Sequence, residues 1–104
     1  MAQFRWSLAA QRDLRNIEEF LAGDLASHAV SLVDRLVSSS ESLEVFPRLG
    51  RVVPEFERGD IREIVVRAYR IVYLLQGDTV LIARVVHGSR DLRRAVRGES
   101  WLTD

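Results

Sequence analysis

Hydrophobic residues dominate the chain between Ile61 and Arg90, where Val, Ile, Leu and Tyr form long runs with arginines set into them at intervals. Runs of β-branched and aromatic residues are typical of strands in a sheet. Gly77-Asp78 interrupts them, and a glycine supplies the positive φ that a two-residue hairpin loop needs. The pattern predicts a strand over Ile61–Val66, a bend or bulge at Arg67-Ala68, and a central hairpin closed by Gly77-Asp78.

The hairpin loop determines which residues lie opposite each other on the two strands. A two-residue loop predicts these cross-strand pairs: Ile71 with Arg84, and Arg70 with Val85. Because side chains alternate between the two faces of a strand, Arg70 would then share a face with His87. Both faces are mostly apolar, so we expect a central hairpin that helices cover on one side.

The first half of the chain carries the patterns of one strand and two helices. Gln3–Trp6 alternates like an edge strand, and Ser7 is a candidate helix N-cap. Apolar residues then recur at helical spacing in two stretches that Gly23-Asp24 separates. Asp24 or Ser27 is the expected cap of the second stretch. The expected apolar stripes are Ala10, Leu14, Ile17 and Leu21 in the first stretch, and Ala26, Val30, Val33, Leu36, Val37, Ser40 and Leu43 in the second.

These elements predict an α+β fold in a single domain over residues 1–104. An N-terminal strand and a two-helix antiparallel hairpin pack on one face of an antiparallel sheet, followed by a short C-terminal helix or tail. Pro47 ends the second helical region, because the residue before a proline is disfavoured in helical conformation. We expect residues 48–60 to form a loop, and Arg90–Arg97 to form a short basic helix or a frayed end.

Composition narrows the function classes. With 104 residues, 47% of them hydrophobic, the chain suits one compact domain with a modest core. It has no apolar run long enough to span a membrane and no signal-peptide pattern at its N-terminus, so we expect the cytoplasm. It has no cysteine and only two histidines, His28 and His87. We therefore expect no disulfide, no metal site and no cofactor.

Charge is unevenly distributed. Residues 1–60 hold seven Arg and ten acids, a balance of −3, whereas residues 61–104 hold eight Arg and five acids, a balance of +3. All fifteen basic residues are arginine. Planar guanidinium groups bind phosphate or carboxylate in a fork, but a GC-rich coding bias would give the same composition. Composition leaves both interpretations open.

Four segments, taken in order, resemble the RelE/ParE superfamily, the toxins of type II toxin-antitoxin modules. They are D-L-R-N-I-E-E-F, F-P-R-L-G-R-V-V-P, I-R-E-I-V-V-R-A-Y-R-I-V-Y and V-V-H-G-S-R-D-L. The resemblance covers about residues 3–96, and its most specific part is Tyr69–Tyr73 followed by His87–Arg90. It implies a RelE/ParE-like fold and a bacterial, growth-inhibiting toxin of a plasmid-stabilisation module.

The superfamily includes two activities. RelE-like members cut mRNA in the ribosomal A site, and the resemblance then implies catalytic roles for Arg70 and Arg90, with His87 as a candidate general base. ParE-like members act on DNA gyrase and are not nucleases. This chain departs from the nuclease pattern, because Ile61-Arg62-Glu63 stands where RelE-like proteins carry a lysine pair and their C-terminal tyrosine is missing. We therefore favour a ParE-like gyrase inhibitor. A ribosome-dependent mRNA endoribonuclease is the alternative, and an inert family member is the second alternative.

The arginines also have a structural interpretation. Arg70 would pair with Glu63 of the adjacent strand, and Arg62 with Asp60 or Glu55. Pairs of this kind usually belong to the scaffold and contribute nothing to catalysis. The sequence leaves both roles open for each of these residues.

The resemblance implies a protein partner. Antitoxins of this group cover the basic groove of the toxin with a disordered, often acidic segment, and the half of the chain that carries the +3 balance is a suitable place for it. The antitoxin would contact operator DNA, so this chain would do so only indirectly. No membrane partner is expected. The residues expected to bind the antitoxin or the target are Arg62, Arg67, Arg70, Arg90, Arg93 and Arg94.

Overall fold

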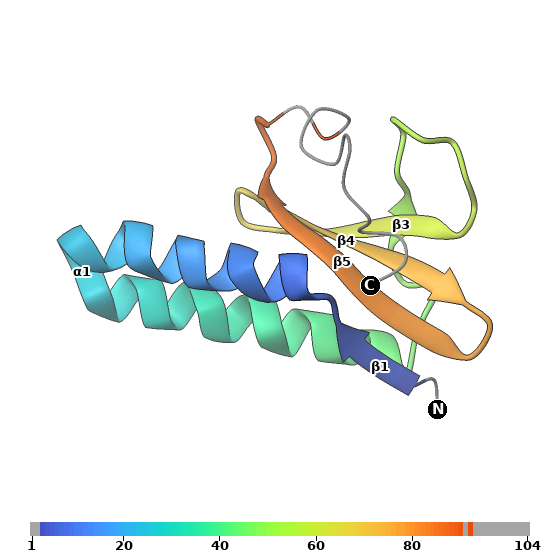
Figure 1. The fold of residues 1–104 in the computed structure, drawn as a ribbon, viewed down its shortest axis with the longest axis horizontal. Coiled ribbons are helices and arrows are strands. Elements are labelled where there is room, and N and C mark those ends of the chain that lie inside the picture. Colours follow the sequence, from blue (N-terminus) through green and yellow to red (C-terminus); the bar gives the residue numbers. More distant parts are fainter. Residues whose placement is uncertain (1–2, 91, 93–104) are drawn as a thin grey trace.

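A computed structural model describes residues 3–90 and 92 of the chain, except for the side chains of residues 22–29. In chain order the elements are strand β1 (Gln3–Trp6), helix α1 (Leu8–Glu41), the 3-10 helix η1 (Ser42–Glu44), and strands β2 (Arg51–Val52), β3 (Ile61–Val66), β4 (Tyr69–Gln76) and β5 (Thr79–His87). The strands form one five-stranded sheet in the order β1-β5-β4-β3-β2. Figure 1 shows the helical segment beside this sheet.

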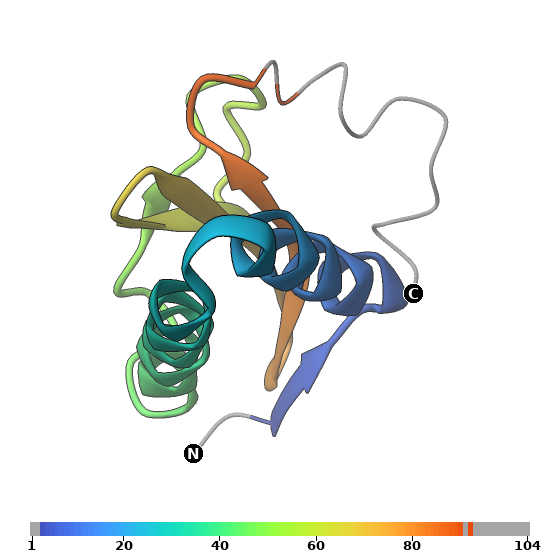
Figure 2. The same cartoon turned by 90° about the vertical axis from the view of Figure 1, so that its left-hand side faces the viewer.

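The helical segment begins as the sequence predicts. The Ser7 side chain accepts a hydrogen bond from the backbone N–H of Ala10, and Ser7 Oγ donates to the carbonyl of Ala83 on β5. Every residue from Leu8 to Glu41 is helical, including Gly23-Asp24. The ribbon nevertheless doubles back midway into two arms that lie side by side, so the predicted two-helix hairpin is present (Figures 1 and 2). The expected caps, Asp24 and Ser27, have side chains outside the described set.

The predicted fold class is confirmed, with two differences in the sheet. The strand β1 pairs with β5 in parallel, which makes the sheet mixed, while the other strand pairs are antiparallel. The region 48–60 is also not entirely loop, because β2 pairs with β3 through Arg51 opposite Glu63 and Val52 opposite Arg62. A two-residue strand is too short to produce a recognisable alternation in the sequence.

The central hairpin has the predicted loop but a different register at its far end. Tyr73 faces Ile82 as the two-residue loop requires, yet the register shifts between Val72 and Tyr73. As a result, Ile71 faces Val85 and Arg70 faces Val86, so both predicted cross-strand pairs are wrong. One additional residue on β5, Ala83, accounts for the shift, as expected of a β-bulge.

The same bulge changes the surroundings of His87. His87 faces Tyr69 in the register, and the two rings meet edge to face with their centroids 5.4 Å apart. Neighbouring residues of a strand point to opposite faces. The prediction that His87 shares a face with Arg70 is therefore wrong, because Tyr69 and Arg70 are adjacent on β4.

The sheet separates two hydrophobic clusters. Alternate residues of β4 contribute to each, with Ile71 and Tyr73 in one cluster and Val72 and Leu74 in the other. The cluster on the α1 side consists of Ala10, Ile17, Leu36, Leu43, Val66, Ile71, Tyr73, Val80, Ile82 and Val85. The cluster on the other side consists of Val53, Ile61, Val72, Leu74, Leu81, Ala83, Val86 and Leu92.

The apolar stripes of α1 are largely where the sequence places them. Ala10 and Ile17 are buried and Leu14 and Leu21 pack against their cluster, whereas Val30 is 55% exposed. In the described part of the chain, no helix is both long enough and apolar enough to cross a membrane. Hydrophobic clusters cover both faces of the sheet, and its strands β3, β4 and β5 carry Arg62, Arg70 and Arg84.

Candidate functional site

Arg70 lies on β4 and points to the sheet face opposite α1, where two carboxylates surround it. Its Nε donates to Glu63 Oε1 at 2.6 Å, while Nη1 and Nη2 donate to the two oxygens of Glu55 at 2.7 and 2.8 Å. Nη2 also lies 2.5 Å from Glu63 Oε1. All three nitrogen atoms of the guanidinium group therefore face carboxylate oxygens, and the residue is only 8% exposed.

The charges at the Arg70 site cancel one another. Hydrogen bonds to Glu55 raise the pKa of the Arg70 guanidinium, burial acts against this, and hydrogen bonds to Glu63 add to the increase. Glu63 is itself fully buried and also accepts from Arg51 Nε at 2.7 Å. Two arginines and two glutamates balance to zero. A third anion at Arg70, such as a phosphate, would have to displace one of the two carboxylates that already occupy the fork.

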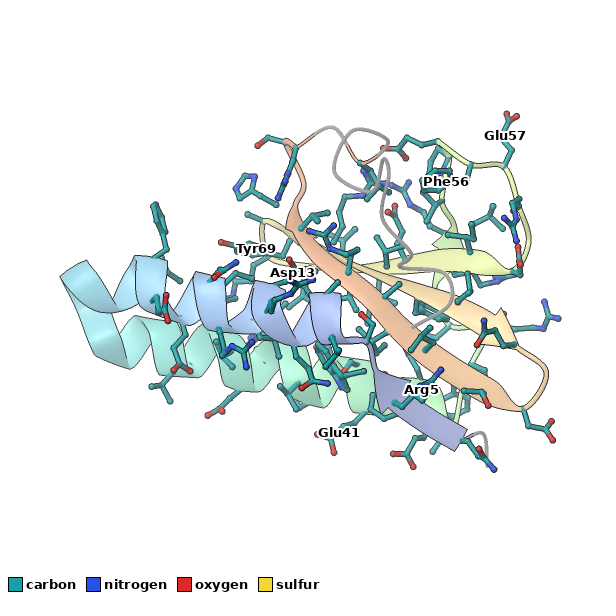
Figure 3. The ribbon with its side chains drawn as sticks, in the orientation of Figure 1. Arg5, Asp13, Glu41, Phe56, Glu57 and Tyr69 are labelled. Carbon is teal, nitrogen blue, oxygen red and sulfur yellow. The ribbon has the colours of Figure 1, made fainter. Side chains whose placement is uncertain are left out.

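The fork depends on the loop between β2 and β3. Val53 is fully buried and its backbone N–H donates to the Ile61 carbonyl, while Phe56 packs against the cluster away from α1 (Figure 3). These two anchors place Glu55, which lies between them in the chain, over Arg70. The sequence predicted the pairing of Arg70 with Glu63, which is confirmed. It gave Arg62 either Asp60 or Glu55 as its partner, because nothing in a loop sequence shows which strand residue the loop covers.

Arg62 has partners other than the predicted acids. Its Nε donates to the Gly59 carbonyl at 3.1 Å and its Nη1 to the Gly50 carbonyl at 2.9 Å. The acid Asp60 is instead bound by Arg58, at 2.7 Å between Nη2 and Oδ2. Hydrogen bonding to Arg58 lowers the pKa of Asp60, and burial opposes this decrease. Arg62 thus connects two loops through their backbones.

His87, Ser89 and Arg90 form an exposed group at the end of β5. The His87 Nδ1 atom accepts a hydrogen bond from the backbone N–H of Ser89 at 3.2 Å and lies 2.7 Å from Ser89 Oγ. A ring nitrogen that accepts from a backbone N–H carries no proton, so in neutral His87 the proton lies on Nε2. The backbone N–H of Arg90 donates to the His87 carbonyl, which keeps Arg90 beside this turn.

Arg67 is the remaining predicted site residue whose placement the structure describes. Arg67 occupies the turn between β3 and β4 with a positive φ of 57°, and it lines a hollow of about 340 Å³ with Leu21, Ser31 and Leu32. Arg93 and Arg94 lie outside the described residues, as does the predicted basic helix or tail beyond Arg90 apart from the buried Leu92.

Sequence reasoning missed a second buried ion pair, between Arg84 on β5 and Asp13 on α1. Arg84 Nε and Nη2 donate to the Asp13 carboxylate at 2.8 and 3.0 Å, and the Val85 N–H donates to the same group at 2.8 Å. Figure 3 shows Asp13 on the first arm of α1, beside the sheet. This contact connects the helix to the bulged part of β5. No group of three His, Asp or Glu side chains is placed to bind a metal ion in the part of the chain that the structure describes.

Comparison with known proteins identifies this architecture. The family model "ParE toxin of type II toxin-antitoxin system, parDE" matches residues 4–92. No curated protein sequence matches the chain significantly.

Two solved structures share the fold. A chain of the chromosomal ParDE toxin-antitoxin system from P. aeruginosa superimposes with a TM-score of 0.72 at 19% identity, covering 84% of this chain and 96% of that chain. A chain of the toxin-antitoxin complex RelBE2 from Mycobacterium tuberculosis superimposes with a TM-score of 0.60 at 22% identity, covering 83% and 96%. Because the family model spans most of the chain, this protein belongs to the ParE toxin family of type II toxin-antitoxin systems.

Proposed function

We propose that this toxin arrests growth by binding and inhibiting DNA gyrase, without a catalytic step of its own, and that a cognate antitoxin neutralises it. The observation that carries the proposal is the closed fork at Arg70. A ribonuclease of the RelE type would need this arginine to bind the scissile phosphate. Here Glu55 and Glu63 occupy all three of its nitrogen atoms.

The geometry of His87 supports the same proposal. A general base needs a ring nitrogen that is free to accept a proton from the attacking hydroxyl. Nδ1 of His87 is instead directed at the backbone N–H and hydroxyl of Ser89 in its own turn. His87 also faces Tyr69 and not Arg70 across the hairpin. This difference in strand face supports a toxin that acts by binding.

The antitoxin part of the proposal rests on the family and on the two similar structures, which are described as a ParDE system and as a toxin-antitoxin complex. Within the half of the chain that carries the +3 balance, Arg70 and Arg84 are neutralised by internal carboxylates. The exposed cations Arg67 and Arg90 remain on the described surface and would contribute to recognition of an acidic segment. Operator DNA would be contacted through the antitoxin.

The target is tested by inducing the toxin without its antitoxin. Growth arrest, transcript integrity and plasmid topology are then measured in the same cells. Gyrase inhibition predicts intact transcripts, relaxed plasmid and a DNA-damage response, and the purified chain should block supercoiling by purified gyrase. Codon-spaced cuts in translated mRNA would instead support the endoribonuclease. Unimpaired growth would support an inert family member.

Two exposed residues provide the sharpest variants. His87→Ala and Arg90→Ala should fold normally, because both side chains are exposed. Toxicity should persist in both, since neither would be catalytic. Loss of arrest together with loss of mRNA cuts, at an unchanged melting temperature, would overturn the proposal. Arg70→Ala is a poorer test, because it leaves Glu63 buried beside Glu55 and should destabilise the domain by about 3–5 kcal/mol, so a loss of toxicity would not distinguish catalysis from instability.

A further inference from the structure

An apolar loop follows the helical segment and is exposed. The loop comprises residues 45–49, named here the Phe46 loop, in which Val45 is 56%, Phe46 63% and Leu49 59% exposed. It borders a hollow of about 590 Å³ that reaches to the end of the central hairpin. The hollow is lined by Val45, Phe46, Pro47, Arg48, Leu49, Leu75 and Gly77. Contiguous exposed apolar surface of this kind marks interaction sites on soluble proteins.

The Phe46 loop is held in a fixed shape. The buried Tyr73 hydroxyl donates to the Pro47 carbonyl at 2.8 Å and accepts from the backbone N–H of Gly50 at 2.9 Å. The backbone N–H of Leu49 donates to the Phe46 carbonyl at 3.0 Å. Hydrogen bonds from a core tyrosine on β4 therefore maintain the exposure of the apolar side chains. A surface that is ordered before binding loses little conformational entropy when a partner covers it.

The charge of the hollow indicates what it binds. Among the described residues that line it, Arg48 is the only charged one. Arg48 is exposed, and the apolar side chains flank it in the sequence. A complementary partner presents large apolar side chains with a carboxylate beside them, the pattern of an amphipathic segment with acidic residues.

We propose that the Phe46 loop and its hollow are the docking site for an amphipathic, acidic segment of the antitoxin, with apolar side chains in the hollow and a carboxylate on Arg48. This rests on the proposed function, which supplies the antitoxin as partner. The site is distinct from the Arg70 fork, whose cation is neutralised internally. Recognition by this surface is chiefly apolar, with Arg48 setting the orientation of the segment.

The test is titration calorimetry of the purified toxin with the antitoxin encoded beside its gene. Phe46→Asp combined with Leu49→Asp should weaken binding about 30-fold or more, the effect expected of apolar anchors at the centre of an interface. The matched control combines Phe20→Asp with Val65→Asp, which places the same charges at two other apolar positions, 79% and 61% exposed, and should bind like wild type. Arg48→Glu should weaken binding about tenfold, and less so at high salt.

The outcomes separate this proposal from the proposed function. A wild-type chain that binds no antitoxin and arrests no growth contradicts the proposed function. A different outcome overturns only the docking site. In it, the antitoxin neutralises the wild-type chain normally and binds the Phe46→Asp, Leu49→Asp variant with the same affinity as the wild type. A variant that loses toxicity but keeps antitoxin affinity assigns the loop to the target and also overturns it.

Two controls complete the design. Light scattering of the toxin without antitoxin tests for self-association. If the wild type is a dimer and the Phe46→Asp, Leu49→Asp variant is a monomer, a second copy of the chain occupies the hollow and the antitoxin assignment is wrong. If the aspartate variant does not fold, Phe46→Ala with Leu49→Ala repeats the titration without added charge. Each variant should match the wild-type circular dichroism spectrum before it is titrated.

Discussion

Arg70 on β4 and Glu63 on β3 lie diagonally across two adjacent strands, with Arg70 Nε 2.6 Å from Glu63 Oε1. Glu63 is fully buried and Arg70 is 8% exposed. A buried pair of this kind contributes little compared with apolar residues of the same size, but loss of one partner leaves a buried charge. The relationship is therefore structural, and it can be tested through stability.

Glu63→Leu should lower the free energy of unfolding by about 3 kcal/mol, because Arg70 then loses one of its two carboxylates. Glu63→Leu combined with Arg70→Leu should be less destabilising than the sum of the two single changes, since both buried charges disappear together. Urea unfolding of the four proteins measures the coupling. Glu18→Ala, at an exposed position of α1, should change stability by no more than about 0.5 kcal/mol. Additive single effects would contradict the coupling.

Asp13→Ala should destabilise the protein by about 3 kcal/mol. It removes the carboxylate that receives hydrogen bonds from Arg84, which is 6% exposed, and from the Val85 backbone. Hydrogen exchange at the Val85 amide should become faster. Asp34→Ala, an exposed acid on the same helix, is the control and should leave both quantities near the wild-type values. Unchanged exchange at Val85 in the Asp13 variant would show that the contact does not hold the bulge.

Because the Tyr73 hydroxyl is buried, we expect the protein to lose stability at alkaline pH. Burial raises the pKa of the Tyr73 hydroxyl, and hydrogen bonding from the Gly50 backbone opposes the increase. A raised pKa means that the folded protein retains a proton that the unfolded chain releases. The associated stability is complete below the ordinary tyrosine pKa of about 10 and is lost as the pH rises through the raised folded value.

Tyr73→Phe should show a flatter decrease of stability above about pH 10 than wild type. The measurement is simplified by composition, because the chain has no Lys or Cys to titrate in this range. At neutral pH the variant should be less stable by about 1–3 kcal/mol, since the Gly50 N–H and the Pro47 carbonyl both lose their hydroxyl partner. Equal pH profiles for the two proteins would rule out a role for Tyr73 in alkaline unfolding.

Gly50→Ala should destabilise the protein by about 1–3 kcal/mol through overpacking. A Cβ at this position would lie 2.5 Å from the Glu63 carbonyl oxygen and 2.7 Å from the Tyr73 hydroxyl. Gly59→Ala is a matched control, because nothing lies within 4 Å of a Cβ placed there. Thermal unfolding should show a lower melting temperature for the first variant alone. Equal melting temperatures would mean that the backbone near β2 moves to accommodate the added methyl group without loss of stability.

Several features of the fold follow from local sequence. The Gly77-Asp78 loop, the strand Ile61–Val66 and the N-cap at Ser7 agree with the structure, because each depends on a turn residue, an alternating run or a cap that acts on its immediate neighbours. The apolar stripe at Ala10 and Ile17 follows from helical periodicity alone. The resemblance to toxins of type II modules could also be read from the order of four short segments.

Other features depend on contacts between residues distant in the chain. The bulge at Ala83 occurs where Ser7 and Asp13 bind β5, 76 and 72 residues away from Ala83 and Val85, and no local pattern records those contacts. The bulge, in turn, places His87 against Tyr69. Glu55 closes the Arg70 fork because a loop is anchored over β4, which the sequence of the loop does not reveal. The sequence alone therefore determined the family and the elements other than β2, through interactions of short range. The tertiary structure decided which arginines are neutralised and which remain exposed, because that depends on charges brought together from separate elements.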